Sequence, residues 1–314
     1  MKVHYYPENF HARNPVVTIG FFDGVHKGHR LLLQQIRQVA AHYQGESVVL
    51  SFWPHPRKIL EQNEQLFLLN SLDEKQRLMA AEKIEYLVII PFNQQVANMP
   101  PDSFMERILV QYLQAKHIIV GYNHHFGNSK KGNYRMLEQG AIRYGFSLEQ
   151  IDPQKEREVE ISSTKIRLAL QQGNITLANA MLGYPYMIEG RVIRGKGIGK
   201  QLGFPTANIQ LSFSDKMLPA DGVYCVELRV QNTHYNGVLN IGNNPTLNEA
   251  CGEKQVEVHI LNFSGDIYGQ PLQLHILKRL RDEEKFDSTA LLCQQISKDI
   301  EEAKHFFKNK EAHQ

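Results

Sequence analysis

Hydrophobic residues in the first half of the chain form short continuous runs, separated by stretches in which apolar residues recur with helical spacing. The runs predict strands at Val16–Gly20, Ser47–Phe52, Tyr86–Pro91, His117–Gly121 and Phe146–Ile151. The stretches between them predict helices at Leu31–Tyr43, Asp73–Lys83, Ser103–Leu113 and Tyr134–Tyr144. Continuous apolar runs are typical of parallel strands that helices cover on both faces. The alternation therefore predicts an α/β fold with an open, right-handed, doubly wound parallel sheet.

The pattern changes near Leu182–Pro185. Beyond this point, short segments of alternating apolar and polar residues predict strands at Met187–Ile193, Tyr224–Val230, Tyr235–Ile241, Val256–Leu261 and Leu272–Leu277. Several short strands with turn signals between them favour an antiparallel barrel or a sandwich. A final amphipathic helix at Ser288–Phe307 is expected to cover this core rather than to bind a partner. We therefore predict two domains, residues 1–183 and 184–314, as a length of 314 residues also favours.

Composition indicates a folded protein, with 42% hydrophobic and 22% charged residues. The net charge is only +2, so we expect neither a nucleic-acid partner nor binding to an anionic membrane. Cys225, Cys251 and Cys293 are far apart in the sequence and odd in number, which favours reduced thiols. The first residues lack the apolar core of a signal peptide, and no apolar run is long enough to span a bilayer. We expect a cytoplasmic protein, a monomer or weak homo-oligomer, whose partners are small-molecule substrates.

The segment from Gly20 to His29 carries the strongest chemical signal in the chain. It lies between the first predicted strand and a predicted helix, where free backbone N–H groups and the helix dipole favour a phosphate. His26 and His29 face the same side of the incipient helix, so both can donate to one polyphosphate. Gly24 and Gly28 permit close approach of the backbone, and Asp23 can cap the turn. Two ordinary surface histidines are the alternative, whereas a zinc site would need further ligands.

Three more segments follow predicted strands on the same side of the sheet: Ser51–Pro56, Gly121–Gly127 and Ser162–Arg167. Ligands of open α/β sheets bind beyond the carboxyl ends of the strands. Ser163 and Thr164 can simply cap a short helix. The Arg167 guanidinium, one turn further on, can grip a phosphate. Convergence of these segments on one rim favours a nucleotide pocket over separate structural roles.

A second glycine-rich segment, Gly190–Asn208, connects strands of the second half. It matches neither the Walker pattern nor the dinucleotide-binding fingerprint. A flexible hairpin is one interpretation. The other is an anion-binding nest formed by Gly195, Lys196 and Gly199. Thr206 and Asn208 then supply neutral oxygens for a Mg²⁺ ion that bridges phosphates.

Glu257 lies between Val256 and Val258 on a predicted strand, so its side chain faces away from theirs. A carboxylate at such a position is either a solvated surface group or part of a site. The spacing alone does not decide between them.

Taken together, separated segments resemble the family of bacterial bifunctional riboflavin kinase/FAD synthetases over nearly the whole chain. The matching segments are Gly20–His29, Phe52–Pro56, Gly121–Gly127, Ser162–Arg167, Gly190–Asn208, Pro219–Tyr224, Asn240–Thr246, Val256–Gly269 and Arg279–Phe286. The resemblance implies an N-terminal FMN adenylyltransferase domain and a C-terminal, six-stranded flavokinase barrel with a terminal helix. The barrel would convert riboflavin and ATP into FMN. The first domain would join FMN to AMP from a second ATP, giving FAD and pyrophosphate.

The resemblance also implies roles for residues of the first domain. His26 and His29 would stabilise charge on the transferred adenylyl group, with Arg167 as a third catalytic residue. The other residues expected to bind nucleotide are Gly20, Phe21, Phe22, Asp23, Gly28, Asn123, Ser163 and Thr164. His124 stands where the family has phenylalanine beside Asn123.

In the barrel, the resemblance assigns Thr206 and Asn208 to Mg²⁺ and Glu257 to the general base. Gly195, Lys196 and Gly199 would bind nucleotide in the same site. Lys200 stands where arginine is more common, which preserves charge but not bidentate geometry.

Three other functions have to be weighed. A monofunctional FMN adenylyltransferase with a flavin-sensing, inert barrel would not need the intact set of Thr206, Asn208 and Glu257. A cytidylyltransferase or a pantetheine-phosphate adenylyltransferase would share the His-x-Gly-His pattern but would not explain the second half. A non-enzymatic flavin-binding regulator would leave the predicted phosphate rim without a purpose.

Overall fold

The computed structural model describes residues 1–60, 66–121, 126–127, 132–151, 161–195, 197–231, 233–243 and 254–312. Contacts divide the chain into two compact units, Met1–Ser163 and Thr164–Gln314. The functional boundary predicted after Gly183 stays a prediction. Asn123, His124 and Lys196 lie outside the described residues.

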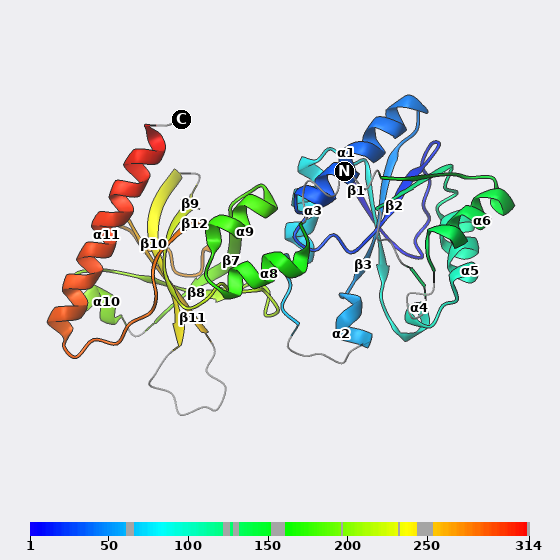
Figure 1. The fold of residues 1–314 in the computed structure, drawn as a ribbon. Helices are drawn as coiled ribbons and strands as arrows, with labels where there is room; N and C mark the ends of the chain where they lie inside the picture. Colours follow the sequence, from blue (N-terminus) through cyan, green and yellow to red (C-terminus); the bar gives the residue numbers. More distant parts are fainter. Residues whose placement is uncertain are drawn as a thin grey trace. The chain divides into compact units, whose positions relative to one another are not determined.

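The first unit is an α/β domain that contains all five predicted strands (Figure 1). Its strands are β1 (Lys2–Tyr5), β2 (Val16–Ile19), β3 (Ser47–Trp53), β4 (Tyr86–Pro91), β5 (His117–Val120) and β6 (Ser147–Gln150). Its helices are α1 (Lys27–His42), α2 (Pro56–Leu60), α3 (Leu72–Ala81), α4 (Gln94–Ala97), α5 (Pro101–Phe104), the π-helical η1 (Met105–Tyr112) and α6 (Tyr134–Tyr144). The sequence pattern missed β1, an edge strand with no buried residue. The single helix predicted at Ser103–Leu113 is two consecutive segments, α5 and η1.

The sheet has the strand order β1-β4-β3-β2-β5-β6, and every neighbouring pair is parallel. The predicted doubly wound sheet is therefore confirmed. The chain proceeds from β2 through β3 to β4 on one side and then returns to place β5 against the other side of β2. The topological switch point lies between β2 and β5. Ligands of such sheets bind beyond the carboxyl ends of the strands at this point.

Both faces of the sheet are covered, which explains why the strands read as continuous apolar runs. Leu33 and Ile36 are fully buried on α1, which packs against β2, β3 and β5. Phe104 and Ile108, from α5 and η1, join the core cluster on the opposite face together with Leu137 of α6. In Figure 1, α1 and α3 flank one side of the sheet, and α5 and α6 flank the other.

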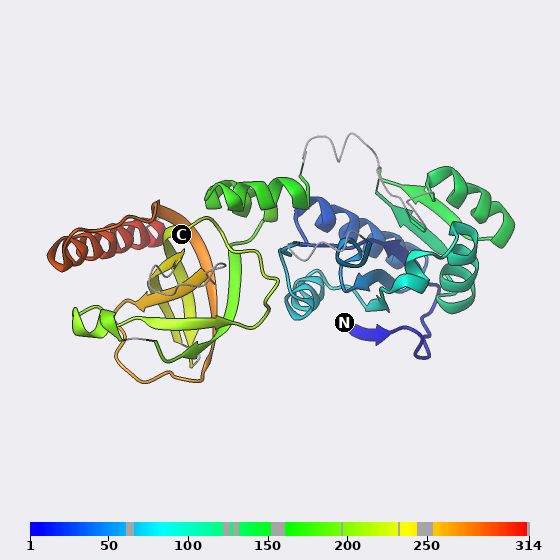
Figure 2. The same ribbon diagram turned by 90° about the horizontal axis from the view of Figure 1, so that it is seen from below.

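The second unit is a closed antiparallel barrel with the strand order β10-β11-β8-β7-β12-β9 (Figure 2). Its strands are β7 (Tyr186–Ile193), β8 (Ala207–Leu211), β9 (Gly222–Val230), β10 (Thr233–Asn243), β11 (Lys254–Ile260) and β12 (Pro271–Arg281). Its helices are α8 (Ser163–Gln171), which begins at the unit boundary, α9 (Ile175–Leu182), α10 (Ile198–Gln201) and α11 (Thr289–Glu311). Of the two predicted architectures, the barrel is confirmed. The pattern missed β8, a short strand with a single buried residue.

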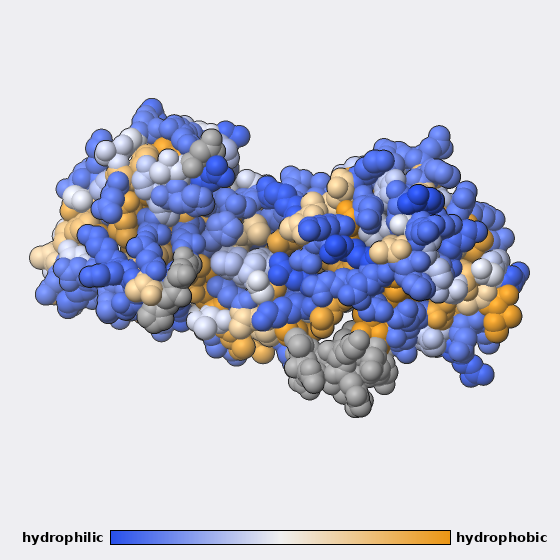
Figure 3. Space-filling view, turned by 90° about the horizontal axis from the view of Figure 1, so that it is seen from above, coloured by the Kyte–Doolittle hydropathy of each residue, from blue (hydrophilic) through white to orange (hydrophobic). Residues whose placement is uncertain are grey.

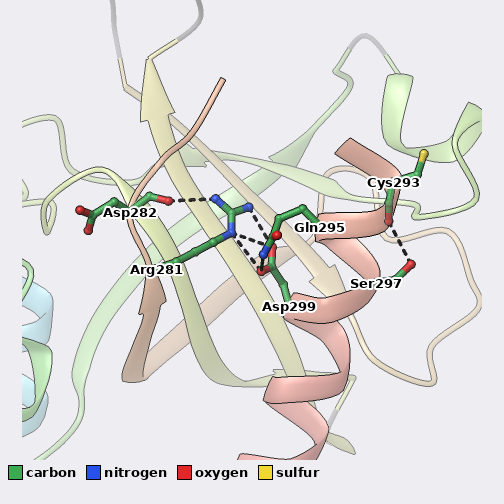
Figure 4. A network of polar contacts seen from close by, with 6 residues as sticks. All are labelled: Arg281, Asp282, Cys293, Gln295, Ser297 and Asp299. Atoms are coloured by element: carbon green, nitrogen blue, oxygen red, sulfur yellow. Dashed lines mark hydrogen bonds and ion pairs between the residues drawn. The ribbon is translucent and has the colours of Figure 1, made fainter. Parts of the chain in front are cut away.

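Two helices are fastened to the barrel by polar contacts. In α9, the Asn179 amide donates to the Ile276 carbonyl at 2.8 Å and accepts from the Tyr186 N–H at 2.7 Å. On α11, the Asp299 carboxylate accepts from Arg281 at the end of β12, with a shortest distance of 2.8 Å (Figure 4). Gln295 donates to the same carboxylate from one turn earlier. The expected role of the terminal helix as core cover fits these contacts and the buried Phe307.

On the face drawn in Figure 3, hydrophilic residues cover most of the surface and hydrophobic residues form small separate groups. Large apolar side chains exposed on the first unit include Leu60 and Phe67. Within the described part of the chain, no helix combines the length and the apolar character needed to cross a membrane.

Candidate active sites

The turn between β2 and α1 has a strained backbone. Phe22, Gly24 and Val25 have φ angles of 51°, 86° and 35°. Only Gly24 adopts such a conformation without steric cost, and strain of this kind concentrates at functional sites. The Val25 N–H donates to the Phe22 carbonyl at 3.3 Å, which closes the turn. The turn lies directly beyond the carboxyl end of β2, at the switch point of the sheet.

His26 is the N-cap of α1, because its Nδ1 accepts from the His29 N–H at 3.3 Å. The expectation that Asp23 caps this turn is therefore wrong. The helix also begins at Lys27, a full turn before the predicted start at Leu31. This cap could not be predicted from the residue type, since histidine is not among the preferred N-cap residues.

The two imidazole rings are stacked, with centroids 3.6 Å apart and an interplanar angle of 14°. A Cβ atom added to Gly28 would lie 3.3 Å from the His26 ring, so a side chain there would press on the pair. The His29 ring is half-buried, but its Nδ1 is enclosed and has no hydrogen-bond partner among the described residues. The prediction that both histidines face the same side is confirmed.

Both histidines are neutral at physiological pH. Burial lowers the pKa of His26 to about 4, and the Asp23 carboxylate opposes this shift only in part. Burial, followed by the charges of His26 and Lys75, holds the pKa of His29 well below its usual range. Since Nδ1 of neutral His26 accepts the cap hydrogen bond, its proton is assigned to Nε2. The ring can therefore offer one neutral N–H to a phosphate.

Asp23 ties the turn to the loop before α3. Its carboxylate is 4% exposed and accepts from the Leu69 N–H at 3.0 Å and from the Asn70 N–H at 3.3 Å. Its backbone carbonyl accepts from the Ser163 hydroxyl at 2.8 Å. Two of the expected nucleotide-binding residues, Asp23 and Ser163, are thus in direct contact.

Lys75 of α3 belongs to this site, although the sequence motifs did not indicate it. Its Nζ donates to the Phe21 carbonyl at 2.7 Å and lies 5.5 Å from the centroid of the Trp53 ring. One signal was present in the sequence. Lys75 precedes the buried Leu78 and Met79 by three and four residues, so it shares their inward face of the helix.

Phe21, Thr164 and Arg167 were also expected to take part in the adenylyl-transfer site. Phe21 is partly exposed, and its ring lies 5.5 Å from Phe52 and 5.2 Å from His55, at the end of β3. Thr164 is exposed and Arg167 is half-buried; both fall in the second unit by their contacts. Their participation in the adenylyl-transfer site, like that of Asn123, stays a prediction.

The barrel brings together the three residues expected to perform its chemistry. The Thr206 hydroxyl donates to a Glu257 carboxylate oxygen at 3.1 Å. Asn208 on β8 is directly opposite Glu257 on β11 in the strand register. Glu257 is half-buried whereas Val256 and Val258 are buried, so the predicted alternation is confirmed.

The glycine-rich loop folds onto these oxygen donors. A Cβ atom on Gly195 would overlap the Asn208 side chain, and one on Gly199 would lie 3.1 Å from the Thr206 hydroxyl oxygen. His259, which the sequence analysis missed, contacts the Pro205 carbonyl at 2.8 Å through Nδ1. Its signal was the alternation on β11, because His259 comes two residues after Glu257 and on the same face.

The donor set in the barrel suits Mg²⁺, which prefers hydroxyl, amide and carboxylate oxygens. Because the Thr206 proton points to Glu257, lone pairs of the Thr206 oxygen remain for a cation. Within the described residues, no cluster of three His, Cys, Asp or Glu side chains competes for a metal.

The strained turn that His26 caps on a parallel sheet and the oxygen-rich site on a barrel suit a two-domain enzyme that transfers phosphate-containing groups. Residues 9–165 match the family model of FAD synthetase, and residues 182–307 match that of riboflavin kinase. The curated bifunctional riboflavin kinase/FMN adenylyltransferase of Haemophilus influenzae is 38% identical, with 93% of this chain and 94% of the relative covered. The enzymes of the same name from Escherichia coli K12 and Bacillus subtilis are 36% and 35% identical. The chain belongs to the family of bifunctional riboflavin kinase/FMN adenylyltransferases, as the sequence resemblance implied.

A solved structure also matches both units. The crystal structure of a protein from Streptococcus pneumoniae, described as a macrolide-efflux protein, has a TM-score of 0.86 and 30% identity to this chain. The match covers 96% of this chain and 98% of the other. The same pair of folds therefore occurs in that protein.

Proposed function

We propose that this chain makes FAD from riboflavin in two ATP-dependent steps at separate sites. The barrel phosphorylates riboflavin to FMN, and the first unit adenylylates FMN to FAD with release of pyrophosphate. The observation that carries the proposal is that each unit has an assembled site. His26 caps α1 and its ring stacks on that of His29, and Thr206 contacts Glu257 in the barrel. An inert, flavin-sensing barrel would not need the second arrangement.

For adenylyl transfer, the FMN phosphate is already an anionic nucleophile. An oxygen of this phosphate forms a bond to the α-phosphorus of ATP, and the bond from that phosphorus to pyrophosphate breaks. The difficulty is to hold two polyanions together and to stabilise the departing charge, which positioning and preorganised donors accomplish. Nε2–H of His26, His29 and the first N–H groups of α1 are suited to this task.

Further residues complete our assignment of the adenylyl-transfer site. Arg167 would neutralise charge on the transferred group. The residues proposed to bind nucleotide are Gly20, Phe21, Phe22, Asp23, Gly28, Asn123, Ser163 and Thr164.

For riboflavin phosphorylation, a neutral alcohol has to lose its proton as it attacks the γ-phosphate of ATP. Glu257 is our general base, since a carboxylate beside the acceptor hydroxyl can take that proton. Thr206 and Asn208 would hold Mg²⁺, which neutralises phosphate charge when bound. Gly195, Lys196 and Gly199 would bind the ATP phosphates.

The proposal is tested with purified protein, ATP and Mg²⁺. In one reaction riboflavin is the flavin substrate and in a second it is FMN, and both products are followed by chromatography. We expect FMN and then FAD in the first reaction, and FAD in the second. Formation of FAD in the second reaction with no FMN or FAD in the first would identify a monofunctional adenylyltransferase and contradict the role of the barrel.

We further propose a cytoplasmic enzyme that acts as a monomer or weak homo-oligomer. Its partners would be small-molecule substrates, with no nucleic acid and no membrane. The functional domains would be residues 1–183 and 184–314. Sedimentation velocity at several protein concentrations tests the oligomeric state, because a stable larger assembly would contradict it.

A further inference from the structure

Lys75 is a buried lysine that the two proposed reactions do not use. It lies in the second turn of α3 and is only 3% exposed. Lysine is almost never this buried unless its charge is paired. The described surroundings supply a carbonyl from Phe21, the face of the Trp53 ring and the nearby charge of Asp23.

These surroundings partly offset the free energy that is needed to bury the Lys75 ammonium group. Removing an ammonium group from water is unfavourable, and an apolar side chain of similar length would avoid the penalty. Burial accordingly lowers the pKa of Lys75 to about 8, although the Asp23 carboxylate raises it. A charged side chain at such a buried position is best explained by the backbone segment to which it donates a hydrogen bond.

Lys75 holds the segment that leads into the phosphate-binding turn. The segment Phe21–Asp23 is fixed from three directions: by Lys75 on the Phe21 carbonyl, by Leu69 and Asn70 on the Asp23 carboxylate, and by Ser163 on the Asp23 carbonyl. Lys75 and the Leu69–Asn70 pair both belong to α3 or the loop that precedes it. The strained residues that follow have to be held in this way, since Phe22 and Val25 have positive φ angles.

We propose that Lys75 is a positioning residue for adenylyl transfer. Its ammonium group fixes the Phe21–Asp23 segment, so that His26, His29 and the N-terminus of α1 keep the geometry that a triphosphate requires. The proposal rests on the proposed function of the first unit. A second effect supports it: the charge of Lys75 helps to keep His29 neutral.

The first test compares Lys75→Met with Lys83→Met in the full-length protein. Lys83 is exposed just beyond the end of α3 and serves as the matched control. Lys75→Met should lower kcat for FAD formation on the order of 10²-fold, the cost of displacing reacting groups by about 1 Å, with a smaller change in KM. Phosphorylation of riboflavin by the same preparation should be unchanged. Adenylylation at the wild-type rate would overturn the proposal.

The second test separates the charge from simple packing. In Lys75→Ala, added n-propylammonium replaces the atoms that the substitution removes, whereas n-propanol replaces their volume and one neutral donor but not the charge. We expect the amine, and not the alcohol, to restore FAD formation. Equal restoration by the two compounds, or restoration by neither, would contradict a role for the ammonium charge and would overturn the proposal.

The same experiments distinguish this inference from the proposed function. If the wild-type protein does not convert FMN to FAD, the proposed function of the first unit is wrong. If the wild-type protein and Lys75→Met convert FMN equally well, only the role of Lys75 is wrong. If near-ultraviolet circular dichroism shows that Lys75→Met folds poorly, the amine rescue of Lys75→Ala decides.

Discussion

The two sites of this chain are built in opposite ways. At the turn before α1, the polar side chains of Asp23, His26 and Lys75 are all buried, and each bonds to backbone groups. In the barrel, Thr206 is exposed and Glu257 is half-buried, and the Thr206 hydroxyl donates to the Glu257 carboxylate. One site is fixed before substrate arrives, whereas the other presents its groups on strands that face solvent.

The difference follows the chemistry that we propose for each site. A phosphate nucleophile needs no base, so rigid donors that face the departing charge are sufficient. An alcohol nucleophile needs a base that can accept a proton while a metal and two substrates occupy the same space. In this chain, the site for which we propose no general base is the one whose polar side chains are held by backbone hydrogen bonds.

The sharpest way to break this comparison is Glu257→Gln. The amide can still accept from Thr206 but cannot take the riboflavin proton. Formation of FMN should fall on the order of 10²–10⁴-fold, the usual contribution of a general base, while added FMN is still converted to FAD. Glu301→Gln on the exposed side of α11 is the control. Retained kinase activity in Glu257→Gln would contradict the role of Glu257 as general base.

The next largest effect is expected for His29→Ala. Loss of one preorganised donor should slow FAD formation on the order of 10²–10³-fold. Phosphorylation of riboflavin should be unaffected, because it takes place in the other unit. His42→Ala, at the exposed far end of the same helix, is the control. An intact rate of FAD formation would show that the stacked rings do not contact the reacting groups.

A smaller effect is expected from pH. Lys75 has a pKa of about 8 because of burial, so its ammonium form predominates below this pH and is lost above it. Asp23 and His29 are the titratable groups that interact with it. As pH rises from 7.5 to 9.5, kcat/KM for FAD formation should fall by up to about tenfold per pH unit. If kcat/KM of Lys75→Met falls in the same way above pH 7.5, the titration belongs to another group.

The smallest effect concerns stability. The pKa of His26 falls from 6.5 in the unfolded chain to about 4 in the folded one. The unfolded state therefore binds more protons between these values, and stability is lost as pH falls through this window, by about 3 kcal/mol at most. His26→Asn keeps a capping side chain and should weaken this dependence. The single tryptophan, Trp53, reports urea unfolding of the first unit by fluorescence. If His26→Asn leaves the pH dependence of the free energy of unfolding unchanged, the pKa of His26 does not differ between the folded and unfolded states.

The sequence was sufficient for the buried parts of the fold. β3 and β4 are continuous apolar runs because both faces of the sheet are covered, and their predicted bounds agree with the structure within one residue. Two strands with little burial were missed. β1 lies at the sheet edge, and β8 has the sequence Ala-Asn-Ile-Gln-Leu, in which only Ile209 is buried.

Site residues could be predicted from the sequence where they lie together in a short motif. Gly20–His29 and Pro205–Asn208 are such segments, and the structure brings His26 to His29 and Thr206 to Glu257. Lys75 was missed because its partner, the Phe21 carbonyl, is distant in the chain and has no side-chain signature. The capping role expected of Asp23 failed for a related reason. Its carboxylate accepts from the backbone N–H groups of Leu69 and Asn70, which are distant in the chain.

The contact between α11 and the barrel has a consequence for sulfur chemistry. Cys225 on β9 is fully buried in a cluster with Ala303 and Phe307 of the helix, and burial raises the pKa of its thiol to about 12. At neutral pH almost none of it is thiolate, the form that oxidants and alkylating agents attack. The Arg281–Asp299 ion pair helps to hold α11 on the barrel. It therefore also helps to protect Cys225 from modification for as long as α11 stays packed there.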